Sequence, residues 1–167
     1  MVDCTTLRQN FYSPKNYRLV IQRLPHVEYF ATDVTVPGLT MNPVAEGSPF
    51  STIYRPGDRA EFGTLDVTFL IDEDLNNYKS IFNWIIGMTY PTQFSEYANL
   101  IAGDGLYSDA TVITQNSSKT SNVEFTFNNI FPISLGAITM NQQEEDVTYA
   151  TATVTFQINN YTIEPYT

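Results

Sequence analysis

The sequence has very few residues of the kinds that build disulfides, zinc sites and nucleophilic triads. One cysteine, Cys4, and one histidine, His26, are present among 167 residues. A single cysteine excludes a disulfide within one chain, which fits a reducing compartment. One cysteine and one histidine cannot complete a structural zinc site. His26 follows Pro25 between two predicted strands and has no evident nucleophile beside it. We therefore expect no catalytic residue, no metal site, no cofactor and no enzymatic activity.

Other functional motifs are also missing. No apolar run approaches the ~20 residues that a membrane helix needs, and the opening residues lack the apolar core of a secretory signal, so we expect no membrane association or secretion. Glycine-rich phosphate loops are absent. The acidic run 72–74 resembles the start of a calcium loop, but Asn77 and Asn83 stand where that loop needs glycine and glutamate. Helix capping explains these acids better.

Charge is scarce and unevenly placed. Charged residues make up 16% of the chain, against about a quarter in typical domains, and the net charge is −10. Residues 1–60 hold six basic and five acidic residues, whereas 61–167 hold two lysines and thirteen acids. The two halves could attract each other between copies, unless folding removes the bias in space. Low charge fits a protein buried in an assembly, or an ordinary β-domain with a threonine-rich surface. The clustered lysines and arginines of a nucleic-acid reader are missing.

The content of aromatic, threonine and valine residues favours β structure. Alternation predicts strands at 17–24, 28–36, 62–71, 109–115, 123–127 and 147–159, with the first two forming a hairpin. The last strand is the longest, and one of its faces carries no charge. That face includes Thr151, Thr153, Thr155 and Gln157. A solvent-facing sheet or a strand that faces a wet channel or a partner would both show this pattern.

The best helix candidate spans about residues 73–87. Leu75, Tyr78, Phe82 and Ile85 recur at spacings of three and four, so we expect these side chains to pack the helix on a sheet. Asp72 is the expected N-terminal cap and Gly87 the expected end.

The chain, residues 1–167, is interpreted as one domain with two projections. Residues 1–15 are polar and predict an N-terminal arm. Residues 39–61 are rich in proline and glycine and predict a protruding loop or hairpin that contacts a neighbouring copy. The candidate contact residues are Phe50, Ile53, Tyr54, Arg55 and Arg59.

Several segments together resemble a known family over roughly residues 16–160. They are NYRLVIQRLP, FATDVTVPGL, YRPGDRAEFG, FNNIFPISLG, VTYATATVTFQI and, most specifically, LDVTFLIDEDLNNYKSIFNWI. The chain resembles the tail-tube proteins of contractile-tailed, T-even-like bacteriophages and their baseplate tube-initiator relatives. The resemblance implies a mainly β (α+β) fold, an antiparallel β-sandwich or barrel with one flanking helix, like the type VI secretion tube protein.

The resemblance also implies a function and a set of partners. In that family six copies form a ring, and the rings stack inside a contractile sheath into a tube through which DNA passes without sequence-specific binding. The implied partners are further copies, the tail sheath, baseplate and tail-terminator proteins, and the implied location is the virion after assembly in the host cytoplasm. The uncharged face of the predicted strand 147–159 would then lie at the lumen, and the predicted helix would lie on the outside of the tube. The alternatives are a tube initiator or junction protein, and a β-sandwich that binds carbohydrate through its tyrosines.

Overall fold

The computed structural model describes residues 12–91, 93–102, 105–140 and 149–166. The described elements are, in chain order, β1 (Tyr17–Ile21), α1 (Pro25–Phe30), β2 (Ala31–Thr35), β3 (Leu39–Met41), β4 (Val44–Gly47), β5 (Thr52–Arg55), β6 (Ala60–Phe62), β7 (Thr64–Leu70), α2 (Asn76–Thr89), α3 (Phe94–Ala102), β8 (Ser108–Gln115), β9 (Ser121–Leu135), β10 (Thr151–Gln157) and β11 (Asn160–Pro165). The predicted arm 1–15 lies outside the described residues up to residue 11.

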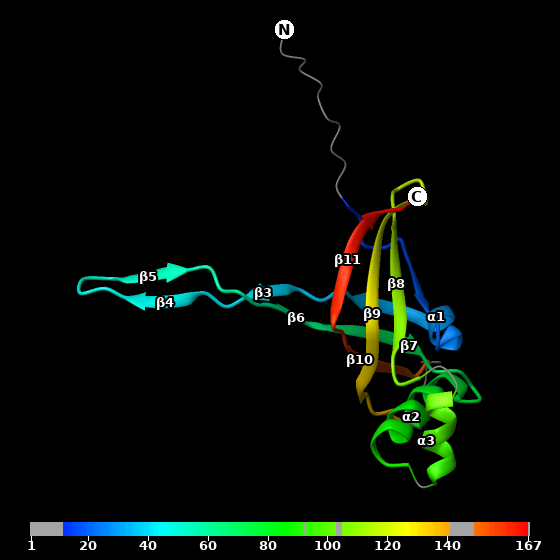
Figure 1. The fold of residues 1–167 in the computed structure, drawn as a ribbon. Helices are drawn as coiled ribbons and strands as arrows, with labels where there is room; N and C mark the ends of the chain where they lie inside the picture. The colour runs from blue at the N-terminus through cyan, green and yellow to red at the C-terminus, as the bar shows by residue number, and fades with distance from the viewer. Residues whose placement is uncertain (1–11, 92, 103–104, 141–148, 167) are drawn as a thin grey trace.

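Seven strands form one strongly bent antiparallel sheet that curls around the core (Figure 1). The strand order is β1-β8-β9-β10-β7-β2, and β11 also pairs with β9. The first part of β9 pairs with β8 and β11, whereas Phe131–Leu135 pairs with β10. Asn129 marks the change with a left-handed φ of 55°, and its N–H donates to the Asp109 carboxylate at 3.0 Å. The mainly antiparallel β fold confirms the prediction, which expected one flanking helix, α2, whereas the structure also has α1 and α3.

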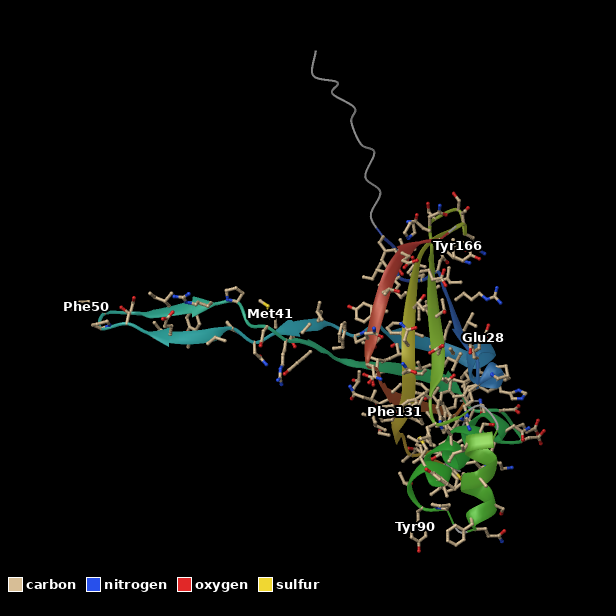
Figure 2. The ribbon with its side chains drawn as sticks, viewed as in Figure 1. Glu28, Met41, Phe50, Tyr90, Phe131 and Tyr166 are labelled. Atoms are coloured by element: carbon tan, nitrogen blue, oxygen red, sulfur yellow. The ribbon has the colours of Figure 1, made fainter. Side chains whose placement is uncertain are left out.

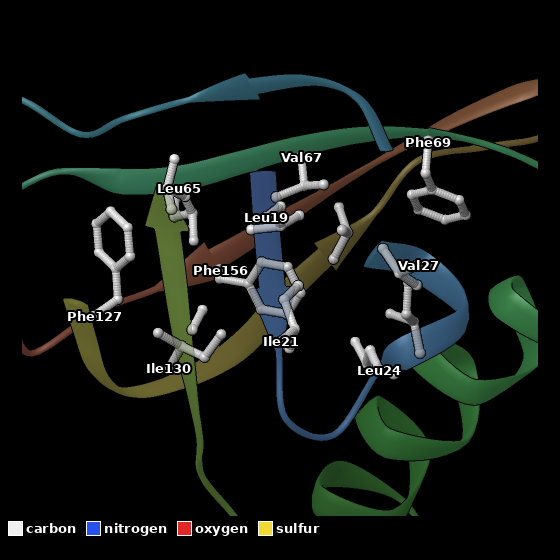
Figure 3. Close-up of a cluster of buried hydrophobic side chains, with 14 of the residues drawn as sticks. Leu19, Ile21, Leu24, Val27, Leu65, Val67, Phe69, Phe127, Ile130 and Phe156 are labelled. Atoms are coloured by element: carbon white, nitrogen blue, oxygen red, sulfur yellow. The ribbon is translucent and has the colours of Figure 1, made fainter. Parts of the chain in front are cut away.

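The core is built from alternating strand residues. Leu65, Val67 and Phe69 of β7 are buried, and the residues between them are only partly covered, as the period-2 pattern predicts. Figure 3 shows these side chains in one cluster with Phe127 of β9 and with Phe156 of the neighbouring strand β10. The sheet thus has one apolar inner face and one polar outer face.

The predicted hairpin of the first two strands is wrong. β1 pairs with β8 and β2 pairs with β7, so the two strands lie at opposite edges of the sheet. The six-residue helix α1 occupies the break between them, where Pro25 sits at its start. Proline is well tolerated there because the first helical N–H groups have no partner within the helix.

The predicted start and end of the long helix are also corrected. The helix begins at Asn76 and its N-terminal flanking residue is Leu75, in a left-handed conformation with φ 58°, so Asp72 is not the cap. Asn77 replaces the cap: its Nδ2 donates to Leu70 O at 2.7 Å and its Oδ1 accepts from Tyr78 N at 2.8 Å. The helix does not stop at Gly87, which is buried within it.

The face that packs α2 on the core differs from the predicted one. The buried residues are Asn77, Ile81, Trp84 and Gly87. Of the predicted set, Tyr78 and Ile85 pack partly against the core, Leu75 is half-buried, and Phe82 is 50% exposed. Trp84 sets this orientation, because its ring packs on Phe156 with centroids 6.2 Å apart and its Nε1 donates to Leu106 O at 3.2 Å.

Candidate assembly surfaces

A long antiparallel arm, residues 39–62, extends away from the barrel (Figure 1). Its base is the β3–β6 ladder, which pairs Leu39 with Phe62 and Met41 with Ala60. Its outer part is the β4–β5 ladder, which runs from Val44 opposite Arg55 to Gly47 opposite Thr52. Every residue of β4 and β5 is exposed. A two-stranded hairpin of this kind is marginally stable at best when it stands alone in water.

The base of the arm is amphipathic. Leu39, Met41, Ala60 and Phe62 share one face by register, and Leu39 and Met41 are more than half exposed. On the other face Thr40 Oγ1 donates to Glu61 O and Asn42 Nδ2 donates to the Glu61 carboxylate, at 3.4 and 3.2 Å. This apolar strip is open to a partner.

The arm is attached to the barrel through stacked aromatic rings. Phe62 meets Tyr161 of β11 edge to face at 5.5 Å, and Tyr161 in turn contacts Phe127 at 5.5 Å. The Tyr161 hydroxyl donates to Pro37 O at 3.2 Å. These contacts fix the direction in which the arm leaves the body.

Close backbone packing requires glycine at one point of the arm. A Cβ placed on Gly57 would lie 2.1 Å from the carbonyl oxygen of Asn42, closer than real atoms approach. By contrast, a Cβ on Gly47 near the tip would meet nothing within 4 Å. Gly57 therefore holds the two legs of the arm together where the two ladders meet.

The predicted contact residues all lie on this arm and are exposed. Phe50 is at the tip (Figure 2) and is 99% exposed. Ile53 and Tyr54 follow on β5, and Arg55 forms an ion pair with Glu46 across the ladder. Arg59 is exposed nearer the base. Their contact with a neighbouring copy stays a prediction.

A second candidate surface is the outer face of β2, β7 and β10, which we call the threonine face. Thr151 and Thr153 are exposed and Thr155 and Gln157 half-buried, while Ala152, Val154 and Phe156 between them are buried. The opposing residues of β7 on this face are Thr64, Asp66 and Thr68. No lysine or arginine occurs in these three strands, so the face is hydroxyl-rich and weakly acidic. β10 is shorter than the predicted strand 147–159, of which 147 and 148 lie outside the described residues.

The helices lie on the other side of this sheet. Trp84 of α2 packs against Phe156, which points away from the threonine face because neighbouring strand residues alternate. α3 packs next to α2 (Figure 1) and exposes Phe94, Tyr97 and Ile101. The threonine face and the helices therefore look in opposite directions.

A cavity of about 290 Å³ opens between the two edge strands β1 and β2. Its walls include Tyr12, Val34, Val36, Val112 and Phe125. At its rim, burial raises the pKa of the Tyr17 hydroxyl above the ordinary value of 10.0, and the negative charge of Asp33 adds to this effect. Most of the cavity wall is apolar, and Asp33 and Thr114 supply polar groups to it.

Within the part of the chain that the structure describes, no group of three His, Cys, Asp or Glu side chains could hold a metal ion. No helix of the described residues has the length and apolarity to cross a membrane. His26 is exposed on α1.

Sequence reasoning missed the cavity, the helix α3 and the apolar strip at the base of the arm. The strip carries a usable signal, because Leu39-Thr40-Met41 and Ala60-Glu61-Phe62 both alternate apolar and polar residues. The cavity has no such signal, since its walls come from segments as distant as Tyr12 and Phe125.

Comparison with known proteins gives matches over nearly the whole chain. A family model described as "Phage tail tube protein" matches residues 5–164. A search of curated protein sequences finds no match.

Solved structures share the fold at low sequence identity. The cap of the anti-feeding prophage, described as a tube-terminating cap, aligns with a TM-score of 0.67 at 13% identity over 95% of this chain and 93% of that one. The PVC sheath-tube complex of an extracellular contractile injection system contains a chain that aligns at 0.67 and 11% identity, covering 95% of each. A type six secretion system protein aligns at 0.50 and 10% identity over 89% of this chain and 82% of that one.

Proposed function

The chain belongs to the phage tail tube protein family, and on that premise we propose that it is the repeating structural subunit of a contractile phage tail tube. Six copies form a ring, rings stack head to tail, and the lumen conducts DNA during genome ejection. DNA slides through this lumen without sequence-specific binding. The chain acts as a building block and not as an enzyme.

The observation that carries the proposal is the threonine face. Thr151, Thr153 and Thr155 offer hydroxyl groups, and Asp66 beside them adds negative charge with no lysine or arginine in the three strands. A basic lumen would bind phosphates and hold the DNA, whereas a hydroxylated, weakly acidic wall lets it slide. This face therefore suits the lumen of a DNA-conducting tube.

The arm and the open strand edges support self-assembly. β1 and β2 are edge strands that do not pair with each other, and exposed edges of this kind bind the strands of other chains. The arm carries Phe50, Ile53 and Tyr54 in exposed positions, which favours burial against a neighbouring copy. Identical copies that each present an arm and an edge can close into a ring.

The same geometry supports a proposal for the other partners. If the threonine face lines the lumen, α2 and α3 lie on the outside of the tube, because they pack on the opposite side of the sheet. The outer helices would then contact the sheath, and the two ends of the tube would contact baseplate and terminator proteins. The protein would be assembled in the host cytoplasm and reside in the virion tail.

As a second candidate function, the chain could form the terminal or initiating ring at one end of the tube instead of its repeating rings. The anti-feeding prophage cap and the PVC sheath-tube chain match this fold with the same TM-score of 0.67, so one fold serves both positions. A terminal subunit would form single rings and stop, whereas a repeating subunit would form tubes of many rings.

Negative-stain electron microscopy of the purified protein tests both positions. We expect hexameric rings and stacked tubes with a central lumen. Rings that never stack would favour the terminal position. A protein that stays monomeric at high concentration would contradict the proposal.

A further inference from the structure

The tip of the arm ends in an apolar side chain with nothing around it. Phe50 is 99% exposed, more than any other large hydrophobic residue among those described. Residues 47–54 of the tip carry no charge, and the nearest charges, on Glu46 and Arg55, are paired with each other. Full exposure of a phenyl ring is unfavourable by the transfer free energy of its apolar surface. The tip is therefore suited to an uncharged, concave partner.

The length of the arm indicates where that partner lies. Each leg of residues 39–62 has about twelve residues, which at ~3.3 Å per residue span roughly 40 Å. The remaining body, about 140 residues, has an expected diameter also of roughly 40 Å. Figure 2 shows Phe50 far from the barrel of its own chain. The tip thus reaches about one body width outward, to the position of an adjacent copy in an assembly.

The cavity between β1 and β2 fits such a tip. Its volume is about 290 Å³ and its walls include Val34, Val36, Val112 and Phe125, with Asp33 as the one charged residue of the lining. An apolar cavity of about 150 Å³ can hold a benzene molecule, so this volume accepts a phenyl ring and part of the adjoining backbone. The second cavity near β1, about 540 Å³, is lined by Lys15, Arg18 and Glu28 and is unsuited to an uncharged tip.

We propose that Phe50 of one copy inserts into the β1–β2 cavity of a second copy. The inference rests on the proposed tube function and adds the receiving site to it. Each copy then donates one phenyl ring and accepts another, a head-to-tail contact that repeats around a ring or along a stack. The aromatic walls supplied by Phe125 and Tyr12 allow edge-to-face ring contacts in addition to burial.

Cysteine cross-linking between different copies tests this pairing. In a Cys4→Ser background, protein with Phe50→Cys is mixed with protein with Tyr12→Cys, at the rim of the cavity, under mild oxidation. The matched control mixes Phe50→Cys with Tyr90→Cys, because Tyr90 is at least as exposed as Tyr12 but lies near the helices at the other end. We expect a disulfide-linked heterodimer for the Tyr12 pair and only background for the Tyr90 pair.

Assembly measurements supply the second readout. Phe50→Ala should raise the protein concentration needed for assembly by about tenfold or more, since a buried phenyl ring is lost, and Phe50→Leu should lie between. The thermal midpoint of the isolated subunit should not change, because the ring is exposed there.

The outcomes separate this inference from the proposed function. Rings or tubes that form without a Tyr12 cross-link above control, or a Phe50→Ala variant that assembles like the parent, would overturn the inference and leave the tube function standing. A Tyr12→Cys thiol that reagents cannot reach in the monomer would show that the chain's own residues fill the cavity, which also overturns it. Failure of the parent protein to assemble would overturn both.

Discussion

Thr68 of β7 and Thr153 of the neighbouring strand β10 lie side by side on one face of the sheet, with their hydroxyl oxygens 3.0 Å apart. The two residues are directly opposite in the strand register, on the face turned away from the core. The contact joins two neighbouring strands of the threonine face by side chains as well as by backbone hydrogen bonds. The wall of the proposed lumen is therefore reinforced by the hydroxyl groups that it presents.

The hydroxyl pair should be measurable as a coupling energy. Thr68→Val and Thr153→Val each remove one partner, and a double-mutant cycle in urea should give an interaction of about 0.5–1 kcal/mol, because a partly exposed hydrogen bond contributes little net stability. Additive single effects would show that the hydroxyl groups prefer water to each other.

A positive charge on the threonine face should hold DNA in the tube. Thr153→Lys places one lysine per subunit on this face, and a ring of such charges binds phosphates. We expect variant tubes to form and to retain double-stranded DNA at low salt, with retention falling as salt rises. Thr153→Val loses the same hydroxyl without the charge and should release DNA like the parent. Equal DNA retention by the lysine and valine variants would argue against a lumen position.

Local patterns could be predicted from the sequence, and long-range pairing could not. The alternation of Leu65, Val67 and Phe69 identified a buried face within one strand, since it depends only on neighbouring residues. The partner of β1 lies at residues 110–114, so nothing near Tyr17 specifies it. The arm was predicted from its prolines and glycines, but its apolar strip depends on the pairing of Leu39 with Phe62.

The predicted start of helix α2 was wrong for a different reason. Acidic residues before a helix usually cap it, but here the polar contacts come from Asn77 inside the first turn, and Leu75 takes the left-handed conformation. The packing face then follows Ile81 and Trp84, not Phe82, because the buried indole packs on Phe156 and donates to Leu106 O. A cavity formed by β1, β2 and the inner residues Val112 and Phe125 required the three-dimensional arrangement.

Loss of the Asn77 side chain should strongly destabilise the fold. Asn77 is fully buried and bonds Leu70 O, Asp72 N and Tyr78 N, so Asn77→Ala removes three hydrogen bonds from partly buried backbone groups. We expect a loss of about 2–4 kcal/mol in the free energy of unfolding by urea titration. Asn83→Ala, at an exposed position of the same helix, is the control and should change it by less than ~0.5 kcal/mol. Similar effects for the two variants would contradict the capping role.

Tyr17 should make stability fall at alkaline pH. Its pKa is raised above 10.0 by burial and by Asp33, so the folded state keeps a proton that the unfolded state releases. Stability from this group is therefore fully present below pH 10 and is lost as the pH rises through the folded pKa. Thermal midpoints of the parent and of Tyr17→Phe should run in parallel up to about pH 10 and then diverge, with the parent falling faster. If the thermal midpoints of the two proteins ran in parallel over the whole pH range, Tyr17 would not be the group responsible for the loss of stability.

Two glycines of the arm offer a matched test of its role in assembly. Gly57→Ala places a Cβ 2.1 Å from Asn42 O and must separate the two legs, whereas Gly47→Ala meets nothing within 4 Å. Because the arm lies outside the core, both variants should keep the thermal midpoint of the isolated subunit close to that of the parent protein. Only Gly57→Ala should weaken ring and tube formation, measured by sedimentation and electron microscopy at increasing protein concentration. If Gly57→Ala assembled as well as Gly47→Ala, the arm could not be a geometrically defined contact, and the neighbouring copies would have to be held by the sheet edges alone.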